Sequence, residues 1–114
     1  MVTQQEYDDA TKRGDKMYEA LPRAIGVRFD ANTRTVVVEL NRGYSISFSP
    51  ERAQDLQNAT VEDLSEVEVS GPGWGIYFPR IDADLRVPAM VNGRFGNDRW
   101  EAAWAEAHPQ DKAA

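Results

Sequence analysis

The stretch from Arg23 to Phe48 constrains the fold most, because its apolar side chains recur at every second position. That spacing places alternate side chains on opposite faces of an extended strand, and it predicts strands buried on one face. In the first strand, Ile25, Val27 and Phe29 are expected to share the buried face. Turn-forming residues separate the apolar runs, at residues 30–33 and 41–43. The stretch therefore predicts an antiparallel meander of three strands, at residues 25–29, 35–40 and 44–48.

A short crossover helix is expected after the meander. Ser49 and Pro50 form a typical helix start, with serine as the N-cap and proline at the first helical position. The helix is expected to end at Asn58. Thr60 and Asp63 then form a capping-box pattern, which predicts one further helical turn.

A second antiparallel unit is expected beyond this helix. Val67 and Val69 alternate with polar residues, which predicts a fourth strand. The glycines and proline of residues 71–73 form a turn into a fifth strand at residues 75–78. Beyond Asp82 the chain is expected to be irregular or briefly helical. The predicted fold class is α+β, an antiparallel sheet of about five strands built from a meander and a hairpin, with helices at both termini.

Capping residues predict the two terminal helices. Thr3 and Glu6 form a capping box at the start of the first helix, and Asn97 or Asp98 caps the last one. A chain of 114 residues is expected to form one domain. Its expected parts are an N-terminal helix, a sheet core with the crossover helix, a C-terminal helix and a polar tail, at residues 1–21, 23–96, 97–107 and 108–114.

Composition limits the classes of function. The chain has no cysteine, which excludes disulfides, thiolate metal sites and cysteine nucleophiles. It has 19 acidic against 13 basic residues, a net charge of −6, which argues against nucleic-acid binding. This charge suits either a solvated protein surface or a surface that meets a basic partner. No apolar run approaches the roughly 18 residues of a membrane helix, and no signal peptide opens the chain, so a soluble cytoplasmic protein is expected.

The candidate site lies in residues 71–87, where glycines, prolines, aromatic residues and two close carboxylates are concentrated. Rigid aromatic side chains beside a charged residue are typical of protein-binding surfaces. We expect the binding residues to be Trp74, Tyr77, Arg80, Asp82 and Asp84.

Alternation along the fifth strand does not decide which of its two faces is exposed. Trp74, Ile76 and Phe78 are expected on one face, and Tyr77 on the other. One set fills the core and the other lies nearer the surface. The same alternatives, core packing or exposed contact, apply to the tryptophans of the C-terminal helix, Trp100 and Trp104.

Asp82 and Asp84 have two interpretations. In an extended segment they point the same way, so a divalent ion could bridge them. The other interpretation is that Asp82 caps a turn by accepting a hydrogen bond from a nearby backbone amide. His108 is the only histidine, so neither an imidazole metal cluster nor a catalytic triad can form. No catalytic residue, metal site or cofactor is predicted.

A recognisable pattern runs through residues 24–29, 36–43, 48–50, 56–60, 63–64, 73–79, 82–85, 87, 93 and 95–96. With this pattern the sequence resembles a bacterial family of unknown function, numbered 2442, over roughly residues 5 to 104. Two departures from the family pattern stand out: Phe78 replaces a common tryptophan, and the tail lacks a basic glycine-rich extension. The resemblance implies a small α+β fold, no established enzyme activity and an antitoxin-like role beside small toxin-like partners.

The expected function is therefore that of a non-enzymatic protein-binding module, either antitoxin-like or a small regulator of a bacterial or phage-borne system. The alternative is a domain that binds a small ligand or a divalent ion, with at most weak hydrolytic activity. The oligomeric state is left open.

Overall fold

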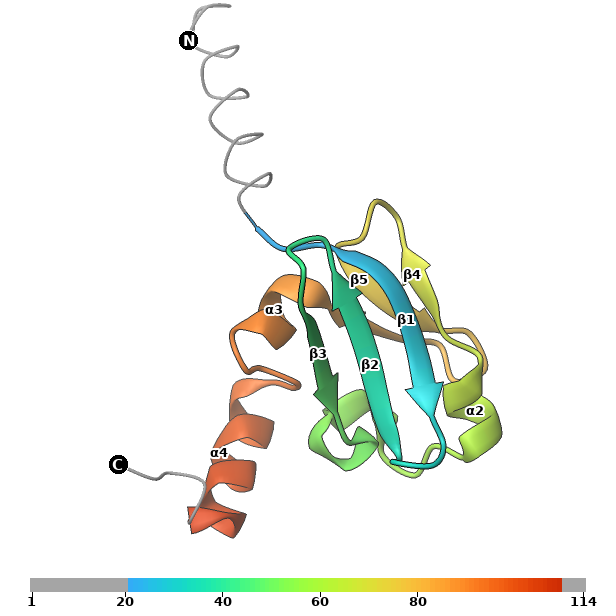
Figure 1. Ribbon diagram of the computed structural model, residues 1–114. Coiled ribbons are helices and arrows are strands. Elements are labelled where there is room, and N and C mark those ends of the chain that lie inside the picture. The colour runs from blue at the N-terminus through green and yellow to red at the C-terminus, as the bar shows by residue number, and fades with distance from the viewer. Residues whose placement is uncertain (1–20, 110–114) are drawn as a thin grey trace, which may run out of the picture.

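The computed structural model describes residues 21–109 of the chain (Figure 1). The predicted N-terminal helix, apart from its last residue, and the end of the polar tail lie outside the described residues. The structure confirms the α+β class. The predicted sheet of about five strands is in fact two antiparallel sheets of three strands each, ordered β1-β2-β3 and β4-β5-β6.

The first sheet is the predicted meander. Its strands are β1 (Ala24–Asp30), β2 (Thr35–Leu40) and β3 (Ser45–Phe48). The Asp30 side chain accepts hydrogen bonds from the amides of Asn32 and Thr33, at 2.9 and 3.3 Å, and so stabilises the turn between β1 and β2.

A β-bulge changes the expected pattern in β1. The register against β2 shifts between Ala24 and Gly26, so that Ala24 is buried while Ile25 is 67% exposed. Val27 and Phe29 still pack against the core. The prediction that Ile25 shares their buried face was wrong, because the extra residue of a bulge reverses the facing of the side chains that precede it.

The link between the sheets is less regular than predicted. Instead of one helix, residues 50–56 form two 3₁₀ turns, η1 (Pro50–Arg52) and η2 (Gln54–Leu56). The extended conformation of Ala53, with φ −100° and ψ 126°, separates them. The short helix α2 (Val61–Ser65) follows, and both hydrogen bonds of the predicted capping box between Thr60 and Asp63 are present, each at 3.1 Å.

The second sheet consists of β4 (Glu68–Ser70), β5 (Gly75–Phe78) and β6 (Ala83–Arg86). The sixth strand was not predicted. The helices α3 (Val87–Val91) and α4 (Asp98–Ala107) follow it, and Asn97 caps α4 by accepting the amide hydrogen of Trp100 at 2.8 Å.

Both sheets share one core. Val36 and Val38 of β2 and Ile76 and Phe78 of β5 are all 0% exposed and belong to the same apolar cluster. In Figure 1 the second sheet lies behind the first, with β4 and β5 next to β1. Each sheet therefore has one buried face and one outer face.

Candidate functional site

The outer face of the second sheet carries most of the predicted site. Along β5 and β6 the core takes Ile76, Phe78, Ala83 and Leu85, so the residues between them face outward. We define the outer face of the second sheet as the outward residues of its three strands, Glu68, Ser70, Gly75, Tyr77, Asp84 and Arg86.

Tyr77 lies at the centre of this face. Its cross-strand neighbours are Glu68 on β4 and Asp84 on β6. Its hydroxyl donates a hydrogen bond to Oδ1 of Asp82, at 2.7 Å. Within residues 21–109, neither Glu68 nor Asp84 forms an ion pair. We call Tyr77, Glu68, Asp82 and Asp84 the Tyr77 acid cluster.

The surrounding carboxylates affect the ionisation of Tyr77. Its pKa is raised from 10.0, first by the hydrogen bond to Asp82, then by desolvation and by the negative charges of Asp82, Glu68 and Asp84. The phenol therefore stays a neutral hydrogen-bond donor at physiological pH. The cluster as a whole presents an aromatic ring beside negative charge, a combination that favours a cationic group.

The backbone around the cluster is constrained. Asp82 has a positive φ of 50°. Its carboxylate accepts the hydrogen bond of the Tyr77 hydroxyl, and not that of a backbone amide, which was one of its two interpretations. A Cβ atom on Gly75 would lie 2.6 Å from Oγ of Ser70 and 2.9 Å from Oδ1 of Asp84. Only glycine leaves space for these two side chains to lie over β5.

Arg80 does not join the cluster. Its Nε atom lies 3.2 Å from Oδ1 of Asp63, and its Nη1 atom 3.9 Å from Oε1 of Glu66. The pKa of Asp63 is lowered, first by the hydrogen bond from the backbone of Thr60 and then by the one from Arg80. Arg80 therefore fixes the turn after β5 to α2, and the prediction that it acts with Tyr77 has no support in this geometry.

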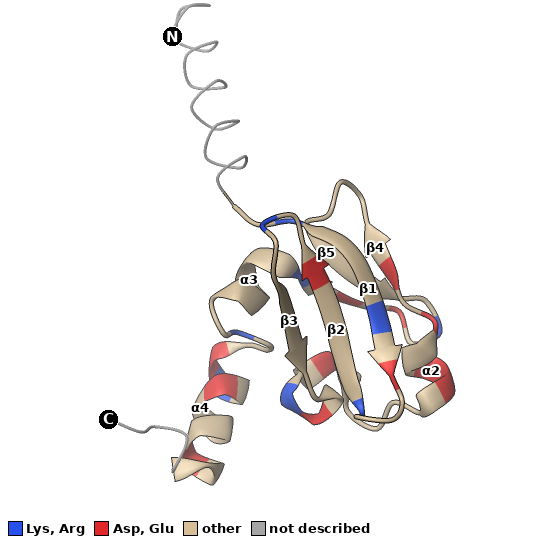
Figure 2. Cartoon of the chain, in the orientation of Figure 1, with Lys and Arg blue, Asp and Glu red and all other residues tan. Residues whose placement is uncertain are grey.

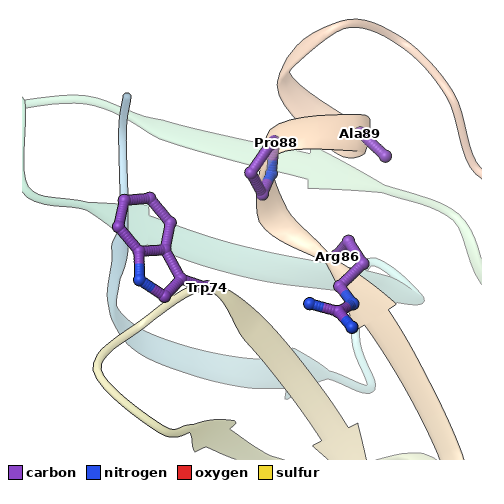
Figure 3. Close-up of a pocket in the computed structure, with 4 residues that line it drawn as sticks. All are labelled: Trp74, Arg86, Pro88 and Ala89. Atoms are coloured by element: carbon purple, nitrogen blue, oxygen red, sulfur yellow. The ribbon is translucent and has the colours of Figure 1, made fainter. Parts of the chain in front are cut away.

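Trp74 lies at the other end of the outer face, in the turn before β5. It is half-buried, unlike Ile76 and Phe78, with which it was expected to share a face. Its carbonyl accepts the amide hydrogen of Val87 at 2.9 Å. The indole borders a hollow of about 520 Å³, whose described lining residues are Trp74, Arg86, Pro88 and Ala89 (Figure 3).

The structure thus brings together three of the five predicted residues, Tyr77, Asp82 and Asp84. Sequence reasoning missed Glu68 and Arg86. Both could have been found by extending the alternation of β4 and β6, which points Glu68 toward Tyr77 and Arg86 to the same face as Asp84.

The carboxylates of this face do not form a set of metal ligands among the described residues. In the part of the chain that the structure describes, no group of three or more histidine, aspartate or glutamate side chains could hold a metal ion. Asp82 is already bonded to Tyr77, so the pair of Asp82 and Asp84 offers few free oxygens where a hard cation needs six or more.

The tryptophans of α4 lie away from this face and are not fully buried, so neither belongs to the core. The Nε1 atom of Trp100 donates to the carbonyl of Arg52 at 3.0 Å. The Arg52 guanidinium lies 5.0 Å from the ring centroids of both Phe95 and Trp104, and it pairs with Glu101 at 2.6 Å. These contacts attach α4 to the turns after β3.

Comparison with known proteins places the chain among uncharacterised relatives. Residues 24–96 match the family described as Protein of unknown function (DUF2442). The chain belongs to this family. The match includes both sheets and the whole outer face of the second sheet, while α4 follows the last matched residue. No curated protein matches the chain.

Two solved structures share the fold. A protein of unknown function from Rhodospirillum rubrum is 36% identical, with a TM-score of 0.67, and the match covers 70% of this chain and 96% of that one. An uncharacterized protein from Chromobacterium violaceum is 26% identical, with a TM-score of 0.69, and the match covers 90% of this chain and 94% of that one. Among the described residues, no helix is long and apolar enough to cross a membrane.

Proposed function

We propose that this chain is a non-enzymatic protein-binding module, and that the outer face of its second sheet contacts the partner. The observation that carries the proposal is the Tyr77 acid cluster. Tyr77 is an outward aromatic residue on the central strand of a sheet, and the carboxylates beside it on both neighbouring strands lack ion pairs within the described residues.

The chemistry of the cluster suggests a cationic partner surface. A lysine or arginine side chain can lie over the Tyr77 ring while it donates to the carboxylate of Asp84 or Glu68. The backbone beneath the cluster is held by two strand partners, so little conformational entropy is lost on binding. In Figure 2 acidic residues also colour parts of β4 and α2, and the net charge of −6 favours rapid association with a basic protein.

The narrower form of the proposal is an antitoxin-like protein, or a small cytoplasmic regulator of a bacterial or phage-borne system. Its support is the family resemblance together with the acidic surface, since a small basic toxin-like protein is the kind of partner that this surface complements. A nucleic-acid partner is disfavoured by the same negative charge.

The experiment is capture of a partner from the native host at low salt by the tagged chain and by two charge-matched variants. We expect a stoichiometric partner to be retained by the wild type and by Glu106→Gln, which removes one negative charge from the exposed surface of α4. We expect Asp84→Asn to lose it. Retention of the partner by both variants, or its absence from the wild-type sample, would contradict the proposal.

A further inference from the structure

Two arginines near Trp74, Arg23 and Arg86, have no carboxylate partner among the described residues. The Cζ atom of Arg23 is 5.7 Å from the centroid of the Trp74 ring, and Arg86 borders the same hollow as that ring. Neither guanidinium makes a hydrogen bond or an ion pair with any residue of the described range 21–109. In a chain with a net charge of −6, this end of the outer face is a local concentration of positive charge.

The described lining of the hollow combines apolar walls with the cationic Arg86. Trp74, Pro88 and Ala89 supply the apolar surface, and Figure 3 shows the Arg86 guanidinium directed into the space beside the indole. Its volume of about 520 Å³ lies within the 300–1,000 Å³ typical of small-molecule sites. Among its described lining residues, an apolar surface with one charged donor suits a ligand with an apolar body and one negative charge.

The walls of the hollow are held in place by the backbone. The amide of Val87 donates to the carbonyl of Trp74 at 2.9 Å, which joins the start of α3 to the turn before β5. The carbonyl of Gly73 accepts the amide hydrogen of Ala24 at 2.8 Å, which joins the same turn to β1. The site is therefore pre-organised, which lowers the entropic cost of binding.

We propose that this hollow binds a monocarboxylate carried on an aromatic or aliphatic group. The carboxylate pairs with the guanidinium of Arg86, whose planar donors match its two oxygens, and the apolar body packs against Trp74 and Pro88. Asp84 faces outward two residues before Arg86 and adds negative charge nearby. That charge favours a monoanion over phosphate or another polyanion.

Such a carboxylate has two sources, a free organic acid or the C-terminal residue of a protein. Both present the same group to Arg86. The described residues that line the hollow are not members of the Tyr77 acid cluster. Its occupancy can therefore be tested with small probes and without a protein partner, so a failure here is distinguishable from a failure of the protein-binding function proposed above.

The test is a nuclear magnetic resonance titration of the isotope-labelled full chain, following the indole N–H of Trp74 and the amide of Ala89. The probes are phenylacetate, its neutral analogue phenylacetamide, and inorganic phosphate. Two further probes distinguish the sources: the tripeptide glycyl-glycyl-phenylalanine with a free carboxylate, and the same peptide with a C-terminal amide.

We expect saturable shifts with phenylacetate, with the free peptide or with both, and none with the amides or with phosphate. Arg86→Gln is expected to weaken binding about 10- to 100-fold, the effect of losing a hydrogen bond to a charged group. The control is Arg28→Gln, which removes an exposed arginine from the first sheet and is expected to leave binding unchanged.

Because Arg86 is exposed, its variant is expected to keep the wild-type spectrum away from the hollow. Phenylacetate binding alone identifies a free acid as the ligand, and peptide binding alone identifies a protein C-terminus. The proposal is overturned if neither acid binds, if the amides or phosphate bind as well as the acids, or if Arg86→Gln binds as tightly as the wild type.

Discussion

The two sheets place different residues at the same structural position. At the middle of the central strand on the outer face, the first sheet has Val37, with Arg28 and Ser47 as its cross-strand neighbours. The second sheet has Tyr77, with Glu68 and Asp84 as its neighbours. The first combination is aliphatic with one cation and one hydroxyl, while the second is an aromatic hydrogen-bond donor between two carboxylates.

This difference in chemistry is why we propose a binding role for the outer face of the second sheet and not for that of the first. The core needs only the inward residues of each strand, so the outward residues are free to vary. On the first sheet they are mostly small or singly charged, as expected for a solvated surface. On the second sheet they concentrate aromatic and charged groups, which suits recognition.

The largest effect on the free energy of unfolding is expected within β5, where adjacent residues face opposite sides of the sheet. Phe78→Ala removes a side chain that is 0% exposed, and it should lower the free energy of unfolding by about 3–5 kcal/mol. Tyr77→Ala removes an outward side chain and should cost roughly 1 kcal/mol. Chemical denaturation measures both. Similar losses for the two variants would mean that the faces are not distinct.

The turns of the two sheets provide the next comparison. Gly73 and Gly43 both have positive φ, 110° and 79°, so alanine is strained at either position. A Cβ on Gly73 would also lie 2.5 Å from the carbonyl oxygen of Ala24, whereas nothing lies within 4 Å of one on Gly43. Gly43→Ala should cost about 1 kcal/mol and Gly73→Ala at least about 2 kcal/mol more. Equal melting temperatures for the two variants would show that the junction between the sheets tolerates this contact.

The next largest difference in stability is expected between Glu101, which pairs with Arg52, and Asp84, which forms no ion pair among the described residues. Desolvation raises the pKa of Glu101, but the hydrogen bonds from Arg52 and from the Phe95 amide lower it by more. The pKa of Glu101 therefore lies below 4.5. Because the folded-state pKa is lowered, this stabilisation is present above about pH 4.5 and is lost as the pH falls through the folded-state value. Glu101→Gln should cost roughly 1–2 kcal/mol at neutral pH. Asp84→Asn, which breaks no ion pair, should change stability by less than about 0.5 kcal/mol. Urea titrations at pH 7 and pH 4 test both expectations, and a Glu101 variant as stable as the wild type at pH 7 would refute the first.

The smallest expected effect on stability comes from the ionisation of the Tyr77 phenol. Its raised pKa means that the neutral form is favoured in the folded state, so the associated stability is present below pH 10 and is lost above it. Asp82→Gly removes the hydrogen-bond acceptor, the largest cause of the raised pKa, and should lower this pKa toward 10.0. Glycine also tolerates the positive φ of 50° at this position. Alkaline titration followed by the resonances of the Tyr77 ring measures the change. An unchanged value would show that the hydrogen bond to Asp82 does not form in solution.

Most of the strand pattern could be predicted from sequence because it depends on local alternation. The strands β2 and β5 follow directly from their β-branched and aromatic residues. The inversion at Ile25 could not be predicted, because a bulge depends on the register against the partner strand. Whether the strands form one sheet or two also depends on contacts between distant parts of the chain.

The candidate site was predicted in part for the same reason. Tyr77, Asp82 and Asp84 lie within one hairpin, so short-range spacing was enough to group them. Arg86 was missed because the aspartate pair was interpreted as part of a turn or an ion site, and β6 was therefore not recognised as a strand. Arg80 was misplaced because its partners, Asp63 and Glu66, lie on an earlier segment that only the folded chain brings close.

The most direct test of the recognition face is a map of the amide resonances of the labelled chain when a captured partner is added. If the outer face of the second sheet is the binding surface, the amides of Glu68, Tyr77 and Asp84 should shift or broaden, and those of Val37 and Ser47 should not. Changes confined to Val37 and Ser47, with those at Tyr77 absent, would contradict the account.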